Sequence, residues 1–332
     1  MGAEDRQPPP PSGTAADDDP LRGIALVALG YFVISLSDAA VKWALPEVGP
    51  ALAMVWRGAF GAAAVLALTA RGAPGRAAAT RRAGGGSVWR AALLRPGNPR
   101  LLAARSALHC VVTVAFYWAW ARGMGLGESY AVAAAAPLVM TLLAVPMLGE
   151  VLRWRRWTST AVGFGGVLIM LRPGGDLWSV EAAVLLGGVA LMAVTRIWTR
   201  LLARSDSPAT VALWLMLAHV PAGLLLLPAF PPPSGSVVPS AGAAVALAAL
   251  GLANGTAHLL FARAFAVAPV GVLAPFEYTT LVWGTALGAL VWGDLPGAWT
   301  LAGAAVVVAA GLYNLHRERV RRGEAQARAA EA

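Results

Sequence analysis

The stretch APFEYTTLVWGTALGALVWGD, residues 274–294, is long and apolar enough to cross a membrane, yet it carries a glutamate well inside. In a helix rising ~1.5 Å per residue from the start of the apolar run, the Glu277 carboxylate lies on the order of 9 Å below the membrane boundary. A charge at that depth costs roughly 2.5–3.5 kcal/mol or more unless another group compensates it. Thr280, Gly284 and Gly288 follow on the same helical face. Such a face suits a cavity or a close helix contact, not lipid.

The composition is that of a membrane protein. Hydrophobic residues make up 58% of the 332 positions and charged residues 13%, with a mean hydropathy of +0.64. A soluble domain carries about 25% charged residues, so we expect lipid to surround most of this chain. The net charge of +9 does not indicate nucleic-acid binding, because no recognition motif accompanies it. With a single cysteine and no metal-like histidine spacing, we expect no disulfide, no metal site and no cofactor.

Ten apolar segments are each interpreted as a membrane span. They cover residues 21–43, 51–69, 101–121, 128–148, 157–171, 180–199, 209–228, 241–262, 270–292 and 298–315. If the N-terminus is cytoplasmic, twenty arginines lie on that side of the membrane and only three cationic residues on the other. We therefore predict a multi-pass protein of the inner (plasma) membrane with both termini cytoplasmic. Residues 1–20, Pro-rich and acidic, would form a disordered tail, and residues 317–332 a basic tail.

The two halves of the chain repeat each other. An offset of 158 positions aligns Lys42 with Arg200, Pro50 with Pro208 and Trp56 with Trp214. After the insertion at 70–100 the offset falls to 144 and aligns Gly149-Glu150 with Gly293-Asp294. Five spans in each half force the second half to insert upside down, so we predict inverted-topology repeats at 21–172 and 173–316. Secondary transporters have this architecture, with the substrate site where the halves meet. Glu277 aligns with Ala133, so the symmetry is broken where that site should lie.

Several motifs resemble those of the drug/metabolite transporter superfamily, of the type built from two EamA repeats. They are SLSDAAVKW (35–43), PLVMTLLAVPMLGE (137–150), LRPG (171–174), TRLLARSDSP (199–208) and APFEYTTLVWG (274–284). The resemblance covers residues 21–318. It implies an all-α integral membrane protein with ten transmembrane helices, acting as a proton-coupled or exchange carrier of small metabolites. The subgroup that looks closest includes S-adenosylmethionine uptake and riboflavin transporters, between which the motifs do not choose.

Nine polar or charged side chains within the apolar spans are the candidate substrate-binding residues: Asp38, Arg57, Arg105, His109, Arg196, Asn254, His258, Glu277 and Tyr278. Asp38 and Arg57 lie at similar depth on the two sides of a short hairpin, so we expect them to meet. They would form either an ion pair that joins two spans or a cavity group that binds substrate or shares its proton.

For the other candidates two interpretations stay open. The histidines, which share helical faces with Arg105 and Asn254, are either neutral hydrogen-bonding groups or a titrating relay. Glu277, with Tyr278 beside it for stacking and hydrogen bonding, is either a site group or one half of a buried ion pair. Its partner would then be Arg105 or Arg196.

Three charged residues near the ends of spans have structural interpretations. Lys42 is either an interface anchor or the partner of Asp38, four residues earlier on the same helix. Glu150 and Asp294 are expected to interact favourably with the positive ends of the helices that follow them.

The function that these patterns favour is a secondary active transporter with a cavity lined by spans one, three, four, six, eight and nine. Because arginines outnumber acids inside the spans, we expect a small-molecule substrate with an anionic or zwitterionic group, and protons are the candidate coupling ion. The protein would be a monomer or a homodimer. Two alternatives are an intramembrane lipid-modifying enzyme, which needs histidines and acids clustered near an interface, and a non-transporting membrane partner, which needs no buried charge.

Overall fold

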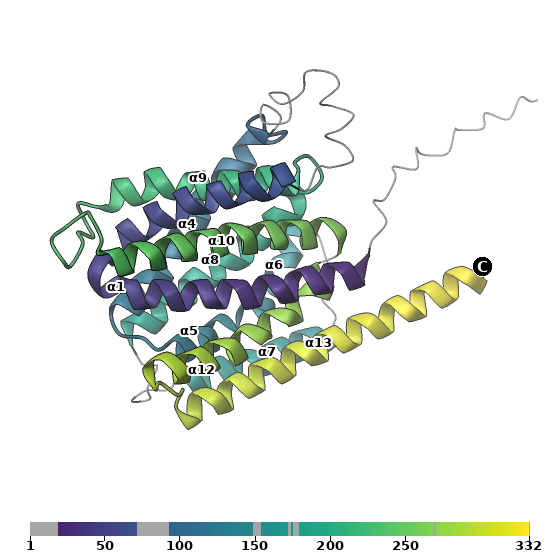
Figure 1. Cartoon of the computed structure of the whole chain (residues 1–332). Helices are drawn as coiled ribbons and strands as arrows, with labels where there is room; N and C mark the ends of the chain where they lie inside the picture. The colour runs from purple at the N-terminus through teal and green to yellow at the C-terminus, as the bar shows by residue number, and fades with distance from the viewer. Residues whose placement is uncertain are drawn as a thin grey trace, which may run out of the picture.

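The computed structural model describes residues 19–71, 93–148, 154–171, 174, 179–268 and 270–331 (Figure 1). Residues 1–18, most of the insertion at 70–100 and Glu150 lie outside those ranges. Within them every regular element is a helix, as the composition predicts. The elements are α1 (Pro20–Arg71), α4 (Pro99–Ala121), α5 (Leu126–Ala133), α6 (Ala136–Leu148), α7 (Trp154–Met170), α8 (Val180–Leu202), α9 (Pro208–Leu226), α10 (Ala241–Val267), α11 (Val270–Leu273), the 3₁₀ helix η1 (Ala274–Tyr278), α12 (Thr279–Trp292) and α13 (Ala298–Glu331).

Helix α1 contains the first two predicted spans and reverses direction between them. Gly49 has φ 67° and ψ 170°, a conformation that only glycine adopts readily, and Pro50 follows it. Before this point α1 runs antiparallel to α10, and after it α1 runs parallel to α10 and packs against α9 as well (Figure 1). The reversal brings residues from the two sides of Gly49 to comparable positions along the bundle.

The fourth and ninth predicted spans are interrupted. Residues 134–135 separate α5 from α6, and η1 separates α11 from α12. Pro137 follows the first interruption and Pro275 lies in η1, where the missing backbone N–H favours a break in the helix. The continuous helix expected around Glu277 is therefore wrong. That residue lies in the 3₁₀ segment, and Ala133, with which it aligns, ends α5 at the other interruption.

Within the described residues, five helical stretches are long and apolar enough to cross a membrane, and they lie in α1, α4, α8, α9 and α10. Three shorter apolar stretches accompany them: Leu126–Met140, Ala161–Met170 and Ala298–Tyr313. The fourth and ninth predicted spans are not among the five long stretches because the interruptions divide each of them into shorter helices. Helix α13 continues beyond the last predicted span as far as Glu331. A multi-pass helical membrane protein follows from these lengths and this hydropathy.

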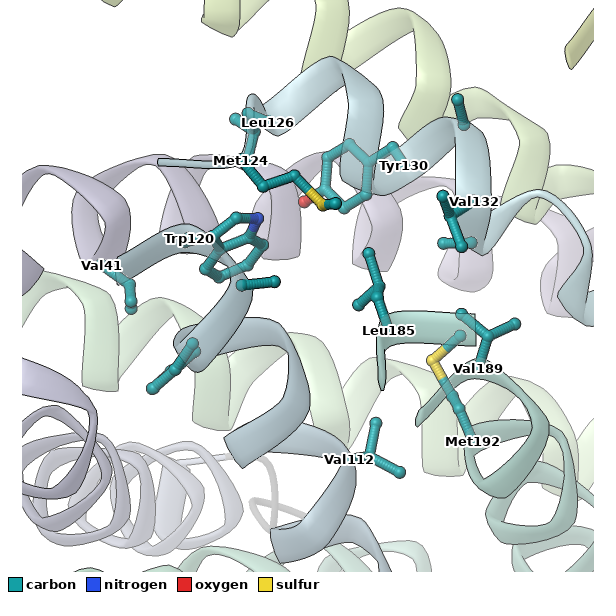
Figure 2. Packing of buried hydrophobic residues seen from close by; sticks show 14 of the residues in the cluster. Val41, Val112, Trp120, Met124, Leu126, Tyr130, Val132, Leu185, Val189 and Met192 are labelled. Carbon is teal, nitrogen blue, oxygen red and sulfur yellow. The ribbon is translucent and has the colours of Figure 1, made fainter. Parts of the chain in front are cut away.

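Small residues let the helices approach closely. Gly303 of α13 lies against the backbone of Gly166 in α7, and Gly284 of α12 lies against the ring of Tyr130 in α5. A Cβ at either glycine would overlap these neighbours, so the face predicted around Gly284 makes a close helix contact. Figure 2 shows Tyr130 in the largest apolar cluster, near Trp120 of α4 and across from α8. This packing holds α4, α5, α8 and α12 around the centre of the molecule.

Candidate functional site

A cavity of about 90 Å³ lies between helices from both halves of the chain. All six predicted spans line it, and so does Arg57 from the second span. The lining residues are Tyr31, Ile34, Asp38, Arg57, His109, Val112, Thr113, Phe116, Tyr117, Trp120, Tyr130, Ala133, Met192, Arg196, His258, Phe261, Glu277 and Thr280. The predicted lining by spans one, three, four, six, eight and nine is therefore confirmed.

Glu277 forms a buried ion pair with Arg196. The guanidinium of Arg196 donates from Nη2 to Glu277 Oε1 at 2.7 Å. The side chain of Arg196 is 13% exposed and that of Glu277 is 3% exposed. Arg196 also donates from Nη1 to the Tyr31 hydroxyl at 2.8 Å. Of the two partners considered from the sequence, Arg196 is the correct one. The pair compensates a carboxylate that would otherwise be costly in lipid, so Glu277 has a structural role whatever else it does.

Asp38 and Arg57 both line the cavity, but they do not form the expected ion pair. Asp38 Oδ2 accepts a hydrogen bond of 2.6 Å from the hydroxyl of Tyr130, while Arg57 donates to other groups. Of the two alternatives, the ion pair was wrong, because depth along two helices does not specify how each helix is rotated about its axis. The side chain of Tyr130, in the interrupted fourth span, forms the hydrogen bond with Asp38 in place of Arg57.

Among the described residues, the partners of Arg57 are neutral. Its Nη1 donates to the Tyr117 hydroxyl at 3.2 Å and its Nη2 lies 3.0 Å from His258 Nε2, while its buried Nε meets no acceptor in the described part of the chain. A guanidinium only donates, so neutral His258 accepts at Nε2 and carries its proton on Nδ1. Among the described residues, no carboxylate forms an ion pair with Arg57. A buried cation without an anion beside a cavity can bind an anionic or acceptor group of a ligand.

Three histidines meet beside Arg57. The ring centroid of His109 lies 5.0 Å from that of His258 and 6.1 Å from that of His219, and His109 Nδ1 lies 3.4 Å from Thr195 Oγ1. His219 is fully buried, with Nδ1 at 2.7 Å from the Leu215 carbonyl. It is absent from the sequence-based candidates and lines neither chamber; it contacts the site through Thr113, whose Oγ1 lies 3.0 Å from its Nε2. Among the described residues, no group of three or more His, Cys, Asp or Glu is arranged to hold a metal ion.

Arg105 lies outside the main cavity, in a smaller adjoining chamber. Its Nε donates to Thr199 Oγ1 at 3.0 Å, and its buried Nη1 has no hydrogen-bond partner in the described part of the chain. His109, His258 and Arg196 line both chambers. Arg105 is therefore separated from the main cavity by these side chains, and it would meet a ligand only beyond them.

Two of the nine candidates do not face either chamber. Asn254 is fully buried and donates from Nδ2 to Ser37 Oγ at 2.8 Å, which joins α10 to α1. The hydroxyl of Tyr278 lies against Gly311 of α13 and has no hydrogen-bond partner among the described residues. The expectation that both would line the site is wrong. In the 3₁₀ segment the side chain of Tyr278 points away from that of its neighbour Glu277.

Lys42 pairs with Asp294 instead of Asp38. Its Nζ lies 3.3 Å from Asp294 Oδ2 and 4.7 Å from the ring centroid of Trp292. The side chain of Asp294 is half exposed, and α13 begins only at Ala298. Asp294 therefore pairs with Lys42 of α1. The expected interaction of its carboxylate with the positive end of the following helix is not observed. Glu150 lies outside the described residues.

Aromatic side chains are the part of the site that the sequence did not indicate. Six of the eighteen lining residues are Phe, Tyr or Trp, whereas these types make up 8% of the chain. Tyr117 and Trp120 stack with their centroids 5.7 Å apart, and Trp120 Nε1 donates to Ser129 Oγ at 2.9 Å. Aromatic residues are common in apolar spans, so nothing in the sequence distinguished those that face a cavity from those that face lipid.

Known proteins with similar sequences are transporters. A riboflavin transporter of Vibrio cholerae is 30% identical over 192 residues, which are 58% of this chain and 63% of that protein. An S-adenosylmethionine uptake transporter of Rickettsia prowazekii is 24% identical over 188 residues, covering 57% and 62%. The chain is a relative of these carriers. The resemblance to EamA-type members of the drug/metabolite transporter superfamily is thereby confirmed.

A longer match extends over most of the chain. The pseudopaline exporter CntI of Pseudomonas aeruginosa is 27% identical over 291 residues, 87% of this chain and 94% of that protein. The matches to the riboflavin and S-adenosylmethionine carriers span less than two thirds of those proteins. One crystal structure aligns with a TM-score of 0.61 at 20% identity, over 90% of this chain and 99% of the other, which shows a shared fold alone. No family model matches the chain.

Proposed function

We propose that this protein is a secondary active transporter that moves a small metabolite across a membrane by alternating access. The observation that carries the proposal is the cavity, where two arginines, two carboxylates and six aromatic side chains from both halves of the chain converge. Ionisable side chains buried inside a membrane protein are characteristic of substrate and ion pathways. Relatives named as importers and as an exporter support transport and leave its direction open.

The cavity volume corresponds to a closed state of such a carrier. Sites for small molecules commonly measure roughly 300–1,000 Å³, several times the 90 Å³ found here. A metabolite would enter only after the lining helices separate. The interruptions near Ala133 and Glu277 are suitable places for that movement, because their backbones are not held by continuous helical hydrogen bonding.

The proposal includes ten spans arranged as two inverted repeats, 21–172 and 173–316. Interruptions at aligned positions of the fourth and ninth spans support it, since Ala134 and Tyr278 differ by the same offset of 144. Paired interruptions of this kind mark the substrate site in known transporter folds. The excess of arginines on one side supports an inner-membrane location with both termini in the cytoplasm.

Reporter fusions test this orientation. Fusions after Arg95 and after Arg322 should both report the cytoplasm, and a fusion after Val238, in the exposed loop between α9 and α10, should report the opposite side. The measurement is the activity of a reporter that is active in one compartment only. The same signal from all three fusions, or opposite signals from the first two, would contradict the inverted arrangement.

We propose that the substrate combines a planar ring with an anionic or other acceptor group. Rings of Phe116, Tyr117 and Trp120 offer stacking surfaces, and Arg57 offers donors that no carboxylate occupies. Riboflavin and S-adenosylmethionine, which similar proteins are named for, both contain a planar heterocycle. A lipid-modifying enzyme is less well supported, because the buried polar groups surround an internal cavity with mostly aromatic and apolar walls.

A binding screen followed by transport tests the proposed function. Purified protein is heated with riboflavin, S-adenosylmethionine and a panel of aromatic carboxylates, and a true ligand at 100 times its Kd should stabilise the fold by about 2.7 kcal/mol. The stabilising compound should then accumulate in proteoliposomes above the rate of empty liposomes. Chemical conversion of the compound, or stabilisation without any transmembrane movement or exchange, would contradict a transporter.

A further inference from the structure

The two carboxylates of the cavity differ in how their charge is compensated. Glu277 is held by Arg196 in a short ion pair. Asp38 is also buried, with 8% of its surface exposed, but among the described residues its hydrogen-bond partner is the neutral hydroxyl of Tyr130, at 2.6 Å. A buried carboxylate without a cation is more costly in its charged form than one that is paired. Protonation is the simplest way for such a group to lose that cost.

The charged and titratable groups around Asp38 are already engaged with other partners. Lys42, on the same helix, pairs with Asp294. Arg57, from the second part of α1, faces Tyr117 and His258 across the cavity. The remaining titratable groups of the lining are Tyr31, His109, Arg196 and Glu277. Among the described residues none of them forms an ion pair with Asp38, so only long-range attraction from the cavity arginines opposes its protonation.

We propose that Asp38 is the proton-binding residue of the transport cycle and that Tyr130 is the residue that positions its carboxylate. This inference rests on the proposed transporter function. The step is a simple proton transfer: hydrated H⁺ gives its proton to the Asp38 carboxylate, a neutral carboxylic acid forms, and water is released. The reverse step returns the proton to the other side after the cavity has reopened there.

The position of Arg57 links this proton to the substrate. With the cavity empty, the positive field of Arg57 favours a charged Asp38. An anionic group bound to Arg57 cancels that field. The charged form of Asp38 then has a higher free energy, so the carboxylate takes up a proton. Substrate anion and proton would therefore bind together and leave together. The predicted coupling is symport of the anionic group with H⁺.

Infrared difference spectroscopy detects the proton without any transport. Spectra of purified wild type are recorded in mildly acidic and in alkaline buffer, both alkaline enough to keep exposed carboxylates ionised, and they should differ by the band of one protonated carboxylic acid. Asp38→Asn should remove that band, whereas Glu277→Gln and Asp294→Asn should retain it. Loss of the band in Glu277→Gln with retention in Asp38→Asn would overturn the assignment, and so would the absence of any titrating band in wild type. Failure of the transporter proposal would leave these spectra unaffected.

Proteoliposome assays then test coupling. Wild type should accumulate the compound found in the screen when a pH gradient is imposed, and Asp38→Asn should lose this gradient-driven accumulation while keeping exchange of labelled for unlabelled compound. Gradient-driven accumulation by Asp38→Asn at the wild-type level would overturn the proposal.

A pair of tyrosine variants covers the case in which Asp38→Asn fails to fold. Tyr130→Phe removes the hydrogen bond that the described residues give to the Asp38 carboxylate, so the carboxylic acid band should persist into more alkaline buffer than in wild type. Tyr278→Phe is the matched control, because the hydroxyl of Tyr278 has no hydrogen-bond partner and lies outside the cavity. An unshifted band in Tyr130→Phe, or an equal shift in both variants, would argue against Asp38 as the group that titrates.

Discussion

Replacing Glu277 by glutamine should lower the free energy of unfolding by about 3–5 kcal/mol, because Arg196 would remain buried without its counter-ion. The amide retains the size of the carboxyl group, so the loss would come from charge and not from packing. The measurement is reversible unfolding of the purified protein in mixed micelles, followed by circular dichroism. Substrate binding should weaken as well, since Arg196 lines the cavity.

A double-mutant cycle separates the ion pair from other effects. The double variant Glu277→Gln/Arg196→Gln should lose less stability than the sum of the losses of the two single variants, by about 1–3 kcal/mol. Asp294→Asn is the control, because the pair of Asp294 with Lys42 is half exposed and should contribute no more than about 1 kcal/mol. Additive losses within a few tenths of a kcal/mol would mean that Glu277 and Arg196 do not stabilise each other.

Replacing Arg57 by glutamine should weaken substrate binding by roughly 30- to 1,000-fold, corresponding to about 2–4 kcal/mol for the loss of a buried charged partner. Arg57 is the cavity cation that no described carboxylate neutralises, so an anionic or acceptor group of the substrate gains most from it. The measurement is the Kd of the compound found by the stability screen. Arg57→Lys should keep part of the affinity, since it retains charge but not the planar set of donors.

Arg122 provides the matched control for this loss. Its side chain is 61% exposed and pairs with Glu181 outside the cavity, so Arg122→Gln should leave the Kd within about twofold. Each variant must elute as wild type does in size-exclusion chromatography, so that misfolding is not counted as lost affinity. Equal affinity of Arg57→Gln and wild type would contradict the role of Arg57 in the site.

Hydropathy and the cost of buried charge were sufficient to predict the class of the protein and the six spans that line the cavity. Both effects act locally along the chain: an apolar segment of sufficient length favours a membrane span, and a polar face within it favours the protein interior. The same logic predicted a cation for Glu277, and Arg196 provides it. Six of the nine candidate residues line the main cavity for this reason, among them Asp38, Arg57 and His258.

The choice of partners was decided only by the tertiary structure. Position along a span specifies a depth and a face of its own helix, but not the rotation of the neighbouring helix. Asp38 therefore meets Tyr130 and not Arg57, and Lys42 meets Asp294 and not Asp38.

The path of the backbone through the interruptions likewise comes from packing among distant segments. Glu277 and Tyr278 are neighbours in sequence, yet in the 3₁₀ helix one faces the cavity and the other faces Gly311 of α13. His219 was not expected at the site. It contacts Thr113, a residue 106 positions away in the chain, and only the packed structure brings the two together. The sequence by itself determined that buried charges must be compensated. Which groups compensate them depends on the rotation of each helix and on the direction of the side chains at the breaks, and both are decided only when the spans pack together.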